Sequence, residues 1–405
     1  TAADPPERSA TWAPNYRGKP TTTPKLDHRF DRESEKGYGK WDARSTTNRL
    51  TRPTQGPILR DLMRILGIET SCDETSAAVL SGPCIVLSSV VSSQLEHLEY
   101  GGVVPELAAR AHLRQLAPIV QIALDEAGLV LDDIEAVAAT QGPGLIGALL
   151  VGFGFAHAMA WARGLPFAAV NHLEGHLLSP LLTDADFEPP FLGLIVSGGH
   201  TELIHSPGWH SYESLGSTLD DAVGEAFDKV AILLGLGYPG GPIIDRVAAA
   251  GRADAWAFPR ARLGPGSLDF SFSGLKTAVR VAVERRRVDR SLAPGSPLPA
   301  SDQADLAASF QAAAVGALVA RLEQAVTTRP VSRVVVAGGV AANRALRAQA
   351  RALCDRLGVR LHLPPLHYCG DNAAMIAAAG ARRLEAGASW PLSVAPVADF
   401  GQLPL

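Results

Sequence analysis

Two histidines four residues apart give the clearest chemical signal in the sequence. His172 and His176 stand at positions i and i+4, so on a helix they would share one face, with Cβ atoms about 5–6 Å apart. Two imidazoles at that separation can chelate one cation. Ordinary surface or core histidines can have the same spacing, so the pattern alone leaves both interpretations open.

The acid in this segment argues against a metalloprotease. Zinc proteases of the H-E-x-x-H type carry a glutamate directly after the first histidine, whereas here that position is Leu173 and the acid is Glu174. One residue turns a helical side chain by about 100°, so Glu174 is expected to point away from a cation. Asp371 precedes an apolar small-residue helix and is either its N-cap or an oxygen ligand.

Glycine turns after expected strands are typical of ligand-binding loops. Residues 197–201 (SGGHT) and the pair Gly338-Gly339 each follow an apolar run, and the amides of such turns can approach phosphate or carbonyl oxygens. The turn at 238–242 (YPGGP) could equally be structural. On a helix, Asp221, Glu225 and Asp228 would share one face. Such a face is usually solvated, but beside a glycine loop it could bind ribose or amino-acid hydroxyls and amines.

The elements that must position these residues alternate between strands and helices, which predicts an α/β fold with ligands at the carboxyl ends of strands. The uncharged run 145–162 is long enough to raise the question of a membrane span. Its glycines and its place after a strand favour a helix packed on a sheet, and we expect no membrane. Strands are expected at 64–68, 76–80, 85–91, 134–140, 191–196 and 333–337, and helices at 105–128, 145–162, 273–288 and 341–357.

Composition limits the classes of function. The 405 residues, of which 47% are hydrophobic and 19% charged, suit a soluble globular protein with two domains. The four cysteines form no C-x-x-C pair, which disfavours a zinc knuckle or a disulfide framework and suits the cytoplasm. Residues 1–62 carry 12 Lys/Arg and 8 Asp/Glu, a net of +4, so the rest of the −4 chain carries −8. That excess argues against a dedicated nucleic-acid-binding domain.

Residues 1–62 differ from the rest of the chain. They are rich in Thr, Pro, Arg and Lys and show no apolar periodicity, which predicts a disordered N-terminal extension. Met63 is the first methionine and stands directly before an expected strand. We therefore expect a chain that starts at Met63 to keep its stability and activity.

Nine ordered segments, from Met63 to about Val397, resemble one family, the tRNA N6-adenosine threonylcarbamoyltransferases, called TsaD or Gcp in bacteria. So many segments in one order make a chance resemblance negligible. The segments are 67–75 (GIETSCDET), 100–107 (YGGVVPEL), 142–145 (GPGL), 172–176 (HLEGH), 196–201 (VSGGHT), 224–229 (GEAFDK), 270–277 (FSFSGLKT), 337–343 (AGGVAAN) and 371–372 (DN).

The resemblance implies the two-lobed α/β fold of actin, Hsp70 chaperones and sugar kinases, with the active site in the cleft between the lobes. We expect an N-terminal lobe at 63–190, completed by a C-terminal helix at about 371–397. The second lobe would cover 191–370, with an insertion at about 251–305. The implied reaction is transfer of a threonylcarbamoyl group from threonylcarbamoyl-adenylate to N6 of adenosine 37, in tRNAs that read codons beginning with A, with release of AMP.

The resemblance also assigns site residues and partners. It implies a metal-dependent acyltransferase that holds one divalent cation, Fe²⁺ or alternatively Zn²⁺, on His172, His176 and Asp371. No general base is assigned. The implied partners are tRNA, threonylcarbamoyl-adenylate, a paralogous subunit and a small ATPase. The implied substrate-binding residues are Ile195, Val196, Ser197, Gly198, Gly199, Asp228, Gly241, Asp245 and Asn343.

The sequence is also compatible with two rival functions and indicates one hypothesis for tRNA docking. A metallopeptidase is disfavoured by the place of Glu174, and a non-catalytic nucleotide-binding scaffold by the complete set of three candidate ligands. Two arginine clusters, at 344/347/351 and 285–287, are candidate contacts for tRNA phosphates. Solvated arginines that bind nothing would look the same in the sequence.

Overall fold

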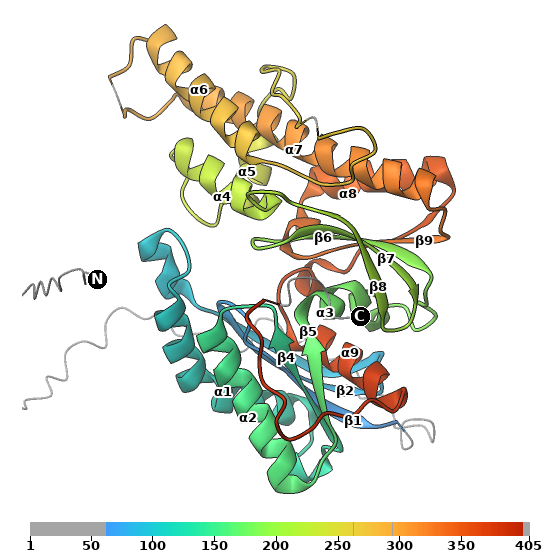
Figure 1. The fold of residues 1–405 in the computed structure, drawn as a ribbon. Coiled ribbons are helices and arrows are strands. Elements are labelled where there is room, and N and C mark those ends of the chain that lie inside the picture. The colour runs from blue at the N-terminus through green and yellow to red at the C-terminus, as the bar shows by residue number, and fades with distance from the viewer. Residues whose placement is uncertain (1–61, 262, 294, 400–405) are drawn as a thin grey trace, which may run out of the picture. The chain divides into compact units, whose positions relative to one another are not determined.

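The computed structural model describes residues 62–261, 263–293 and 295–399. The extension expected to be disordered lies outside these residues, except for residue 62. The described chain forms two mixed five-stranded sheets with helices on their faces (Figure 1).

The first sheet has the strand order β3-β2-β1-β4-β5. The first three strands run antiparallel to one another, while β4 lies parallel to both β1 and β5. The strands are β1 Arg64–Glu69, β2 Glu74–Ser81, β3 Ile85–Ser93, β4 Ala136–Gly142 and β5 Phe167–Asn171.

The second sheet repeats this connectivity, with the order β10-β9-β6-β7-β8. The first three strands, β6, β7 and β8, again pair antiparallel in chain order. On the other side of β6, β9 pairs parallel to β6 and β10 pairs parallel to β9. Two sheets of equal connectivity in one chain confirm the predicted two-lobed α/β class. The strands are β6 Phe191–Val196, β7 Thr201–Gly208, β8 Ser211–Ser217, β9 Arg333–Ala337 and β10 Arg360–His362.

Helices cover both faces of the first sheet because alternate side chains of a strand point to opposite sides. In β1, Leu66 and Ile68 belong to a core shared with α1 (Pro105–Ala127) and α2 (Ile146–Arg163). Ile65, one residue before Leu66, points to the opposite face and belongs to a core shared with α9 (Ala373–Glu385). A helix from the far end of the chain therefore completes the first sheet.

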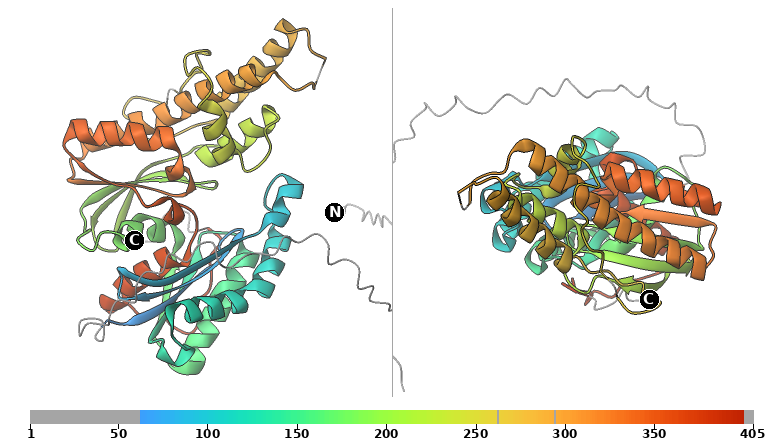
Figure 2. Two further views of the ribbon diagram at one scale, coloured as in Figure 1. Left: turned by 180° about the vertical axis from the view of Figure 1, so that it is seen from behind. Right: turned by 90° about the horizontal axis from the view of Figure 1, so that it is seen from above.

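The second sheet carries its own helical layer on one face, visible from behind in Figure 2. The helices are α4 Val223–Leu233, α5 Gly240–Ala248, α6 Ser273–Asp289, α7 Ala300–Thr328 and α8 Arg344–Leu357. Short 3₁₀ turns link several elements: η2 Leu95–Tyr100, η3 Leu131–Asp133, η4 Ser179–Leu182, η5 Gly339–Ala342 and η6 Leu366–Tyr368.

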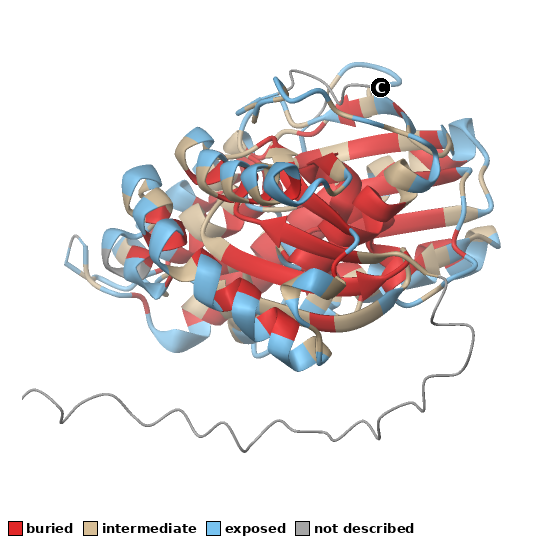
Figure 3. Cartoon of the chain, turned by 90° about the horizontal axis from the view of Figure 1, so that it is seen from below, coloured by how far each residue is buried: buried red, intermediate tan, exposed pale blue. Residues whose placement is uncertain are grey.

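One short helix, α3 (His172–Leu178), lies with α9 between the two sheets. Their buried side chains share a core with Ala138 of the first sheet and with Ile195 and Val335 of the second. Figure 3 shows this buried middle of the described chain in red. Side chains from either sheet can therefore meet around α3 and α9.

The predicted strands at 191–196 and 333–337 are confirmed, and the predicted helices at 105–128, 145–162 and 273–288 match α1, α2 and α6 within two residues. The helix predicted from 341 begins three residues later, because η5 tightens the chain and Asn343 then caps α8. Of the three acids predicted to share a helical face, Glu225 and Asp228 lie three residues apart on α4, whereas Asp221 precedes the helix, so the prediction is wrong for Asp221. Asp228 accepts a hydrogen bond from the N-terminus of α5.

Two helices, α2 and α7, pass a length-and-composition test for a membrane span. Core helices of soluble proteins pass the same test. Of the most apolar 18-residue stretch in each helix, 61% is buried in α7 and 33% in α2. The buried side chains of α2 pack against the first sheet. The expectation that residues 145–162 form a helix packed on a sheet is confirmed.

Candidate metal and substrate site

The two histidines are placed by the junction of β5 and α3. Asn171 ends the strand and caps the helix, its Oδ1 accepting hydrogen bonds from the amides of Leu173 (2.8 Å) and Glu174 (3.4 Å). The cap holds His172 in the first turn, and His176 follows one turn later on the same face. Both imidazoles are buried.

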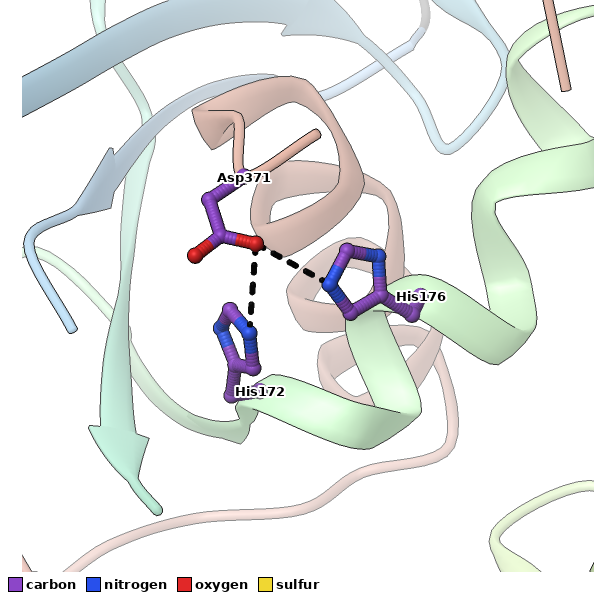
Figure 4. Close-up of side chains that lie close together, drawn as sticks. All are labelled: His172, His176 and Asp371. Atoms are coloured by element: carbon purple, nitrogen blue, oxygen red, sulfur yellow. Dashed lines mark hydrogen bonds and ion pairs between the residues drawn. The ribbon is translucent and has the colours of Figure 1, made fainter. Parts of the chain in front are cut away.

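Asp371 reaches the histidines because its neighbour caps the helix. The Oδ1 atom of Asn372 accepts from the amide of Met375 (3.0 Å), so Asn372 is the N-cap of α9. The N-cap alternative for Asp371 is therefore wrong, and its carboxylate is free to turn toward α3. In Figure 4 the carboxylate faces both imidazole rings.

The three side chains converge on one small volume. Oδ1 of Asp371 lies 3.1 Å from Nε2 of His176 and 3.4 Å from Nε2 of His172 (Figure 4). One donor atom from each residue lies within 4.8 Å of the other two. Two imidazole nitrogens and one carboxylate oxygen are a donor set that suits Fe²⁺ or Zn²⁺. The residues present therefore fit the predicted cation.

A buried carboxylate orients the first histidine. Nδ1 of His172 lies 2.9 Å from Oε2 of Glu69 and 3.2 Å from Oγ of Ser71. Glu69 itself accepts from the hydroxyl of Thr140 (2.6 Å) and from the amide of Ser71. Because a carboxylate can only accept, Nδ1 is protonated, so Nε2 is the nitrogen that a cation can bind.

The charges of this cluster support one another. Burial on its own would lower the pKa of His172, but Asp371 and Glu69 raise it well above its usual value. Burial likewise opposes ionisation of Asp371, yet His172 and His176 hold its pKa well below the ordinary range. The protein thus keeps a negative oxygen beside the two nitrogens.

The loop after β6 lies beside this cluster. Oγ of Ser197 accepts from the amide of His200 (3.0 Å), and the amide of Ser197 donates to the carbonyl of His200 (2.8 Å), which closes a tight turn. Gly198 and Gly199 are exposed, with no atom near the position of an added Cβ. Burial, followed by the charges of His172 and His176, lowers the pKa of His200 to about 4, so that ring is neutral at pH 7.

Two glycines, Gly224 and Gly338, let the start of α4 and the turn after β9 lie close to this loop. An added Cβ at Gly224 would lie 2.5 Å from the carbonyl oxygen of Ser197, and one at Gly338 would lie 2.5 Å from that of Val196. Gly338 also has φ +95°, a conformation that favours glycine. The turns after β6 and β9 and the start of α4 therefore meet at one place.

The other predicted substrate residues have defined local roles. Asp228 accepts from the amide of Gly240 (2.6 Å) and from that of Gly241, and so binds the N-terminus of α5. Asn343 caps α8 and donates to Gln311 (2.8 Å). Asp245 pairs with Arg344 (2.7 Å) on the neighbouring helix.

Ile195 and Val196 are fully buried in β6, so only their main chain can face a ligand. The structure thus places the turn that holds residues 197–199 near the three candidate ligands, since His200 at its end interacts with their charges. It places Asp228, Gly241, Asp245 and Asn343 along the edge formed by α4, α5 and α8. Their contact with a substrate stays a prediction.

The arginine clusters are largely engaged within the protein. Arg344 pairs with Asp245, and Arg347 donates to the carbonyls of Ala341 and Pro364. In the second cluster, Arg286 and Arg287 pair with acidic side chains. Among the described residues, Arg285 and Arg351 are exposed without such a partner. Each cluster therefore offers fewer free charges than its sequence indicates.

The sequence interpretation gave no role to Glu69 and Ser71, which orient His172. Their only signal is a Glu-Thr-Ser run at the end of a strand, where α/β folds bind ligands. Glu174 does point away from the three ligands, as predicted. It is nevertheless fully buried, in contact with Tyr212 and Arg383.

Two solved structures share the fold of this chain. The HypF protein of T. kodakarensis superposes with a TM-score of 0.54 at 15% identity, over 80% of this chain and 48% of that one. A full-length HypF in a phosphate- and nucleotide-bound form gives 0.51 at 12% identity, over 81% of this chain. This chain spans about half the length of those structures, and at such identities the likeness shows the fold alone.

Sequence comparison is more specific. The TsaD family, tRNA N6-adenosine threonylcarbamoyltransferase, matches residues 85–378. The enzyme of that name from Bordetella petrii is 53% identical over 80% of this chain and 92% of its own length. Its counterpart from Trichlorobacter lovleyi is 51% identical over 84% of this chain and 100% of its own length.

The fold and the site define a two-lobed α/β protein with a candidate metal cluster between its sheets. The chain belongs to the tRNA N6-adenosine threonylcarbamoyltransferase family, as its sequence motifs indicated. It is accordingly a transferase that modifies tRNA.

Proposed function

We propose that this chain transfers a threonylcarbamoyl group from threonylcarbamoyl-adenylate to N6 of adenosine 37, in tRNAs that read codons beginning with A, and releases AMP in the cytoplasm. The observation that carries the proposal is the convergence of two imidazole nitrogens and one carboxylate oxygen beside an open glycine turn. Membership of the family supports the reaction class, and the site supports the chemistry.

The chemistry requires attack on the carbonyl carbon of a mixed carbamoyl–phosphoryl anhydride. The N6 lone pair forms the new C–N bond, the bond from that carbon to the phosphate oxygen breaks, and AMP leaves with the electron pair. One N6 proton is lost to an acceptor that we do not assign. Because an exocyclic amine is a poor nucleophile, alignment of the two substrates supplies much of the rate.

His172, His176 and Asp371 would hold one Fe²⁺ or Zn²⁺ per chain. A cation there supplies Lewis-acid polarisation of substrate oxygens. Glu69 fixes the tautomer of His172, so that its Nε2 stays available.

The glycine turn would hold the negative end of the substrate. Gly198 and Gly199 lack side chains that would keep an oxygen away from the main-chain amides, and amides aimed at developing charge lower the barrier of acyl transfer. His200 closes the turn and, being neutral at pH 7, adds no positive charge there. The adenylate would lie along α4, α5 and α8, near Asp228, Gly241, Asp245 and Asn343.

A paralogous subunit and a small ATPase are proposed partners, as the family resemblance implies. One candidate contact is the outer face of α1 and α2, where apolar side chains are exposed. Leu113 and Trp161 are each 69% exposed and Leu150 is 56% exposed. Exposed apolar groups gathered on adjoining helices are typical of protein interfaces.

Mass analysis of tRNA nucleosides tests the reaction. Unmodified tRNA is incubated with threonylcarbamoyl-adenylate and the protein, with and without the partner subunits, then digested. We expect threonylcarbamoyladenosine together with an equal amount of AMP. A matched tRNA carrying guanosine at position 37 should give neither product. AMP release without modified nucleoside would show hydrolysis alone and would contradict the proposal.

A further inference from the structure

A fully buried carboxylate lies between the two histidine ligands in the sequence but takes no part in the metal cluster. Glu174 has 0% exposure, and its Oε1 atom accepts from Oη of Tyr212 (2.9 Å) and from Nδ1 of His210 (3.1 Å). Its Oε2 atom accepts from Nε of Arg383 (2.6 Å). We name these four residues the Glu174 cluster.

The Glu174 cluster joins three separate elements. Glu174 lies on α3, His210 and Tyr212 lie at the β7–β8 turn and on β8, and Arg383 lies in the last turn of α9. A second contact ties the same turn to α9, because the guanidinium of Arg382 stacks 4.3 Å from the ring centre of Trp209. The second sheet, α3 and α9 are thus tied together in one place.

The same two helices supply all three candidate ligands. α3 carries His172 and His176, and Asp371 stands two residues before the first residue of α9. The helices pack closely at Gly175, where an added Cβ would lie 2.8 Å from Cδ1 of Ile376. Close packing at this point sets the distance between the helices. The bonds to Glu174 add a directional constraint, one directly through Arg383 of α9 and two through the β7–β8 hairpin, which is itself tied to α9 by the Arg382–Trp209 contact.

We propose that Glu174 is a positioning residue that fixes α3 relative to α9, and so brings the histidines and Asp371 to the separation that one cation requires. The inference rests on the proposed metal function. A buried ion pair contributes little to stability compared with apolar residues of similar volume. A geometric role accounts for this carboxylate better than a contribution to stability does.

The chain offers a matched control for a buried acid. Asp302 on α7 is 4% exposed and pairs with Arg286 (2.7 Å) and Arg290 (3.0 Å). It touches none of the elements that carry the ligands. Glu174→Gln and Asp302→Asn both replace a buried carboxylate with an amide of the same shape, and both should lower the melting temperature.

The experiment measures the dissociation constant for Zn²⁺ by competition with a chromophoric chelator, well below the melting temperature of each full-length variant. We expect Glu174→Gln to bind Zn²⁺ roughly 10- to 100-fold more weakly, the range found when groups that orient ligands are lost. Asp302→Asn should match the wild type. With saturating Zn²⁺, kcat for threonylcarbamoyl transfer should recover in Glu174→Gln.

The outcomes separate this inference from the function on which it rests. Wild-type protein that binds no Zn²⁺ at the site would remove the proposed metal function, and this inference with it. Tight wild-type binding with equal affinity in Glu174→Gln would overturn the inference alone. If Glu174→Gln does not fold, Tyr212→Phe removes one of the three hydrogen bonds. A smaller but measurable loss of affinity is then expected, and an unchanged affinity would overturn the inference.

Discussion

At the scale of single residues, α3 and α9 each begin with a capping asparagine next to a candidate metal ligand. Asn171 caps α3 and leaves His172 free, and Asn372 caps α9 and leaves Asp371 free. An amide satisfies the helix terminus, so the adjacent imidazole or carboxylate can turn to its neighbours. Glu69 then sets which nitrogen of His172 is available.

The first prediction concerns pH. Asp371 and Glu69 raise the pKa of His172 well above its usual value, so at pH 7 the metal-free ring carries a second proton, on Nε2, that a cation must displace. Metal affinity should therefore fall as pH falls, by up to about tenfold per pH unit for one proton. Chelator competition between pH 6 and pH 8, with calorimetry in buffers of different ionisation heat, measures the proton released. An affinity that is constant across this range would be inconsistent with a protonated His172.

At the scale of elements, glycines decide how closely helices approach the first sheet. An added Cβ at Gly152 of α2 would lie 2.1 Å from Oγ1 of Thr70, whose hydroxyl donates to the carbonyl of Ala148. Two residues on, Gly154 is exposed and its added Cβ would meet no atom within 4 Å. The same helix thus contains one glycine that packing requires and one that it does not.

These two glycines give a matched pair of substitutions. Gly152→Ala should destabilise the protein by about 1–3 kcal/mol, because the methyl group overpacks the contact with Thr70. Gly154→Ala should be neutral or stabilise by up to about 1 kcal/mol through helix propensity. Urea unfolding of both variants measures the difference. Equal stabilities would mean that α2 does not pack on Thr70 as closely as described.

The sequence predicted most elements because their patterns are local. The runs at 191–196 and 333–337 are apolar and end in small polar or glycine turns, so they were recognisable as strands. The beginning of α8 could not be predicted exactly, because a 3₁₀ turn and an α-helix have similar periodicity over four residues. The spacing of the histidines made them candidate ligands, but only the family resemblance linked them to Asp371, because 195 residues separate His176 from Asp371. Glu174 could not be paired with Arg383 for the same reason.

At the scale of the described chain, two five-stranded sheets of the same connectivity pack against a shared middle layer formed by α3 and α9. The metal cluster lies in that layer beside the Ser197–His200 turn, so each sheet contributes to the site. On the far face of the first sheet, α1 and α2 expose apolar side chains, which we propose as the contact for a partner subunit. The candidate metal site and the proposed partner contact thus lie on opposite faces of one sheet.

The partner surface can be tested without disturbing the site. Leu150→Arg places a charge on the exposed face of α2 and should leave the melting temperature unchanged. It should weaken binding of the paralogous subunit at least tenfold, since charges are depleted at the centres of interfaces. Val288→Arg, at a residue 77% exposed on α6, is the control. Light scattering of the mixed proteins reports the complex; equal assembly by both variants would exclude this face.

We propose that threonylcarbamoyl transfer depends on a cation held by His172, His176 and Asp371. The most direct measurement strips the protein with a chelator and follows formation of threonylcarbamoyladenosine in tRNA as Fe²⁺ or Zn²⁺ is returned. We predict that transfer is lost on stripping and returns until one ion per chain is bound, and that folded His176→Ala and Asp371→Ala variants recover neither metal nor transfer. Transfer at the normal rate by stripped protein, or full metal occupancy in both variants, would contradict this account.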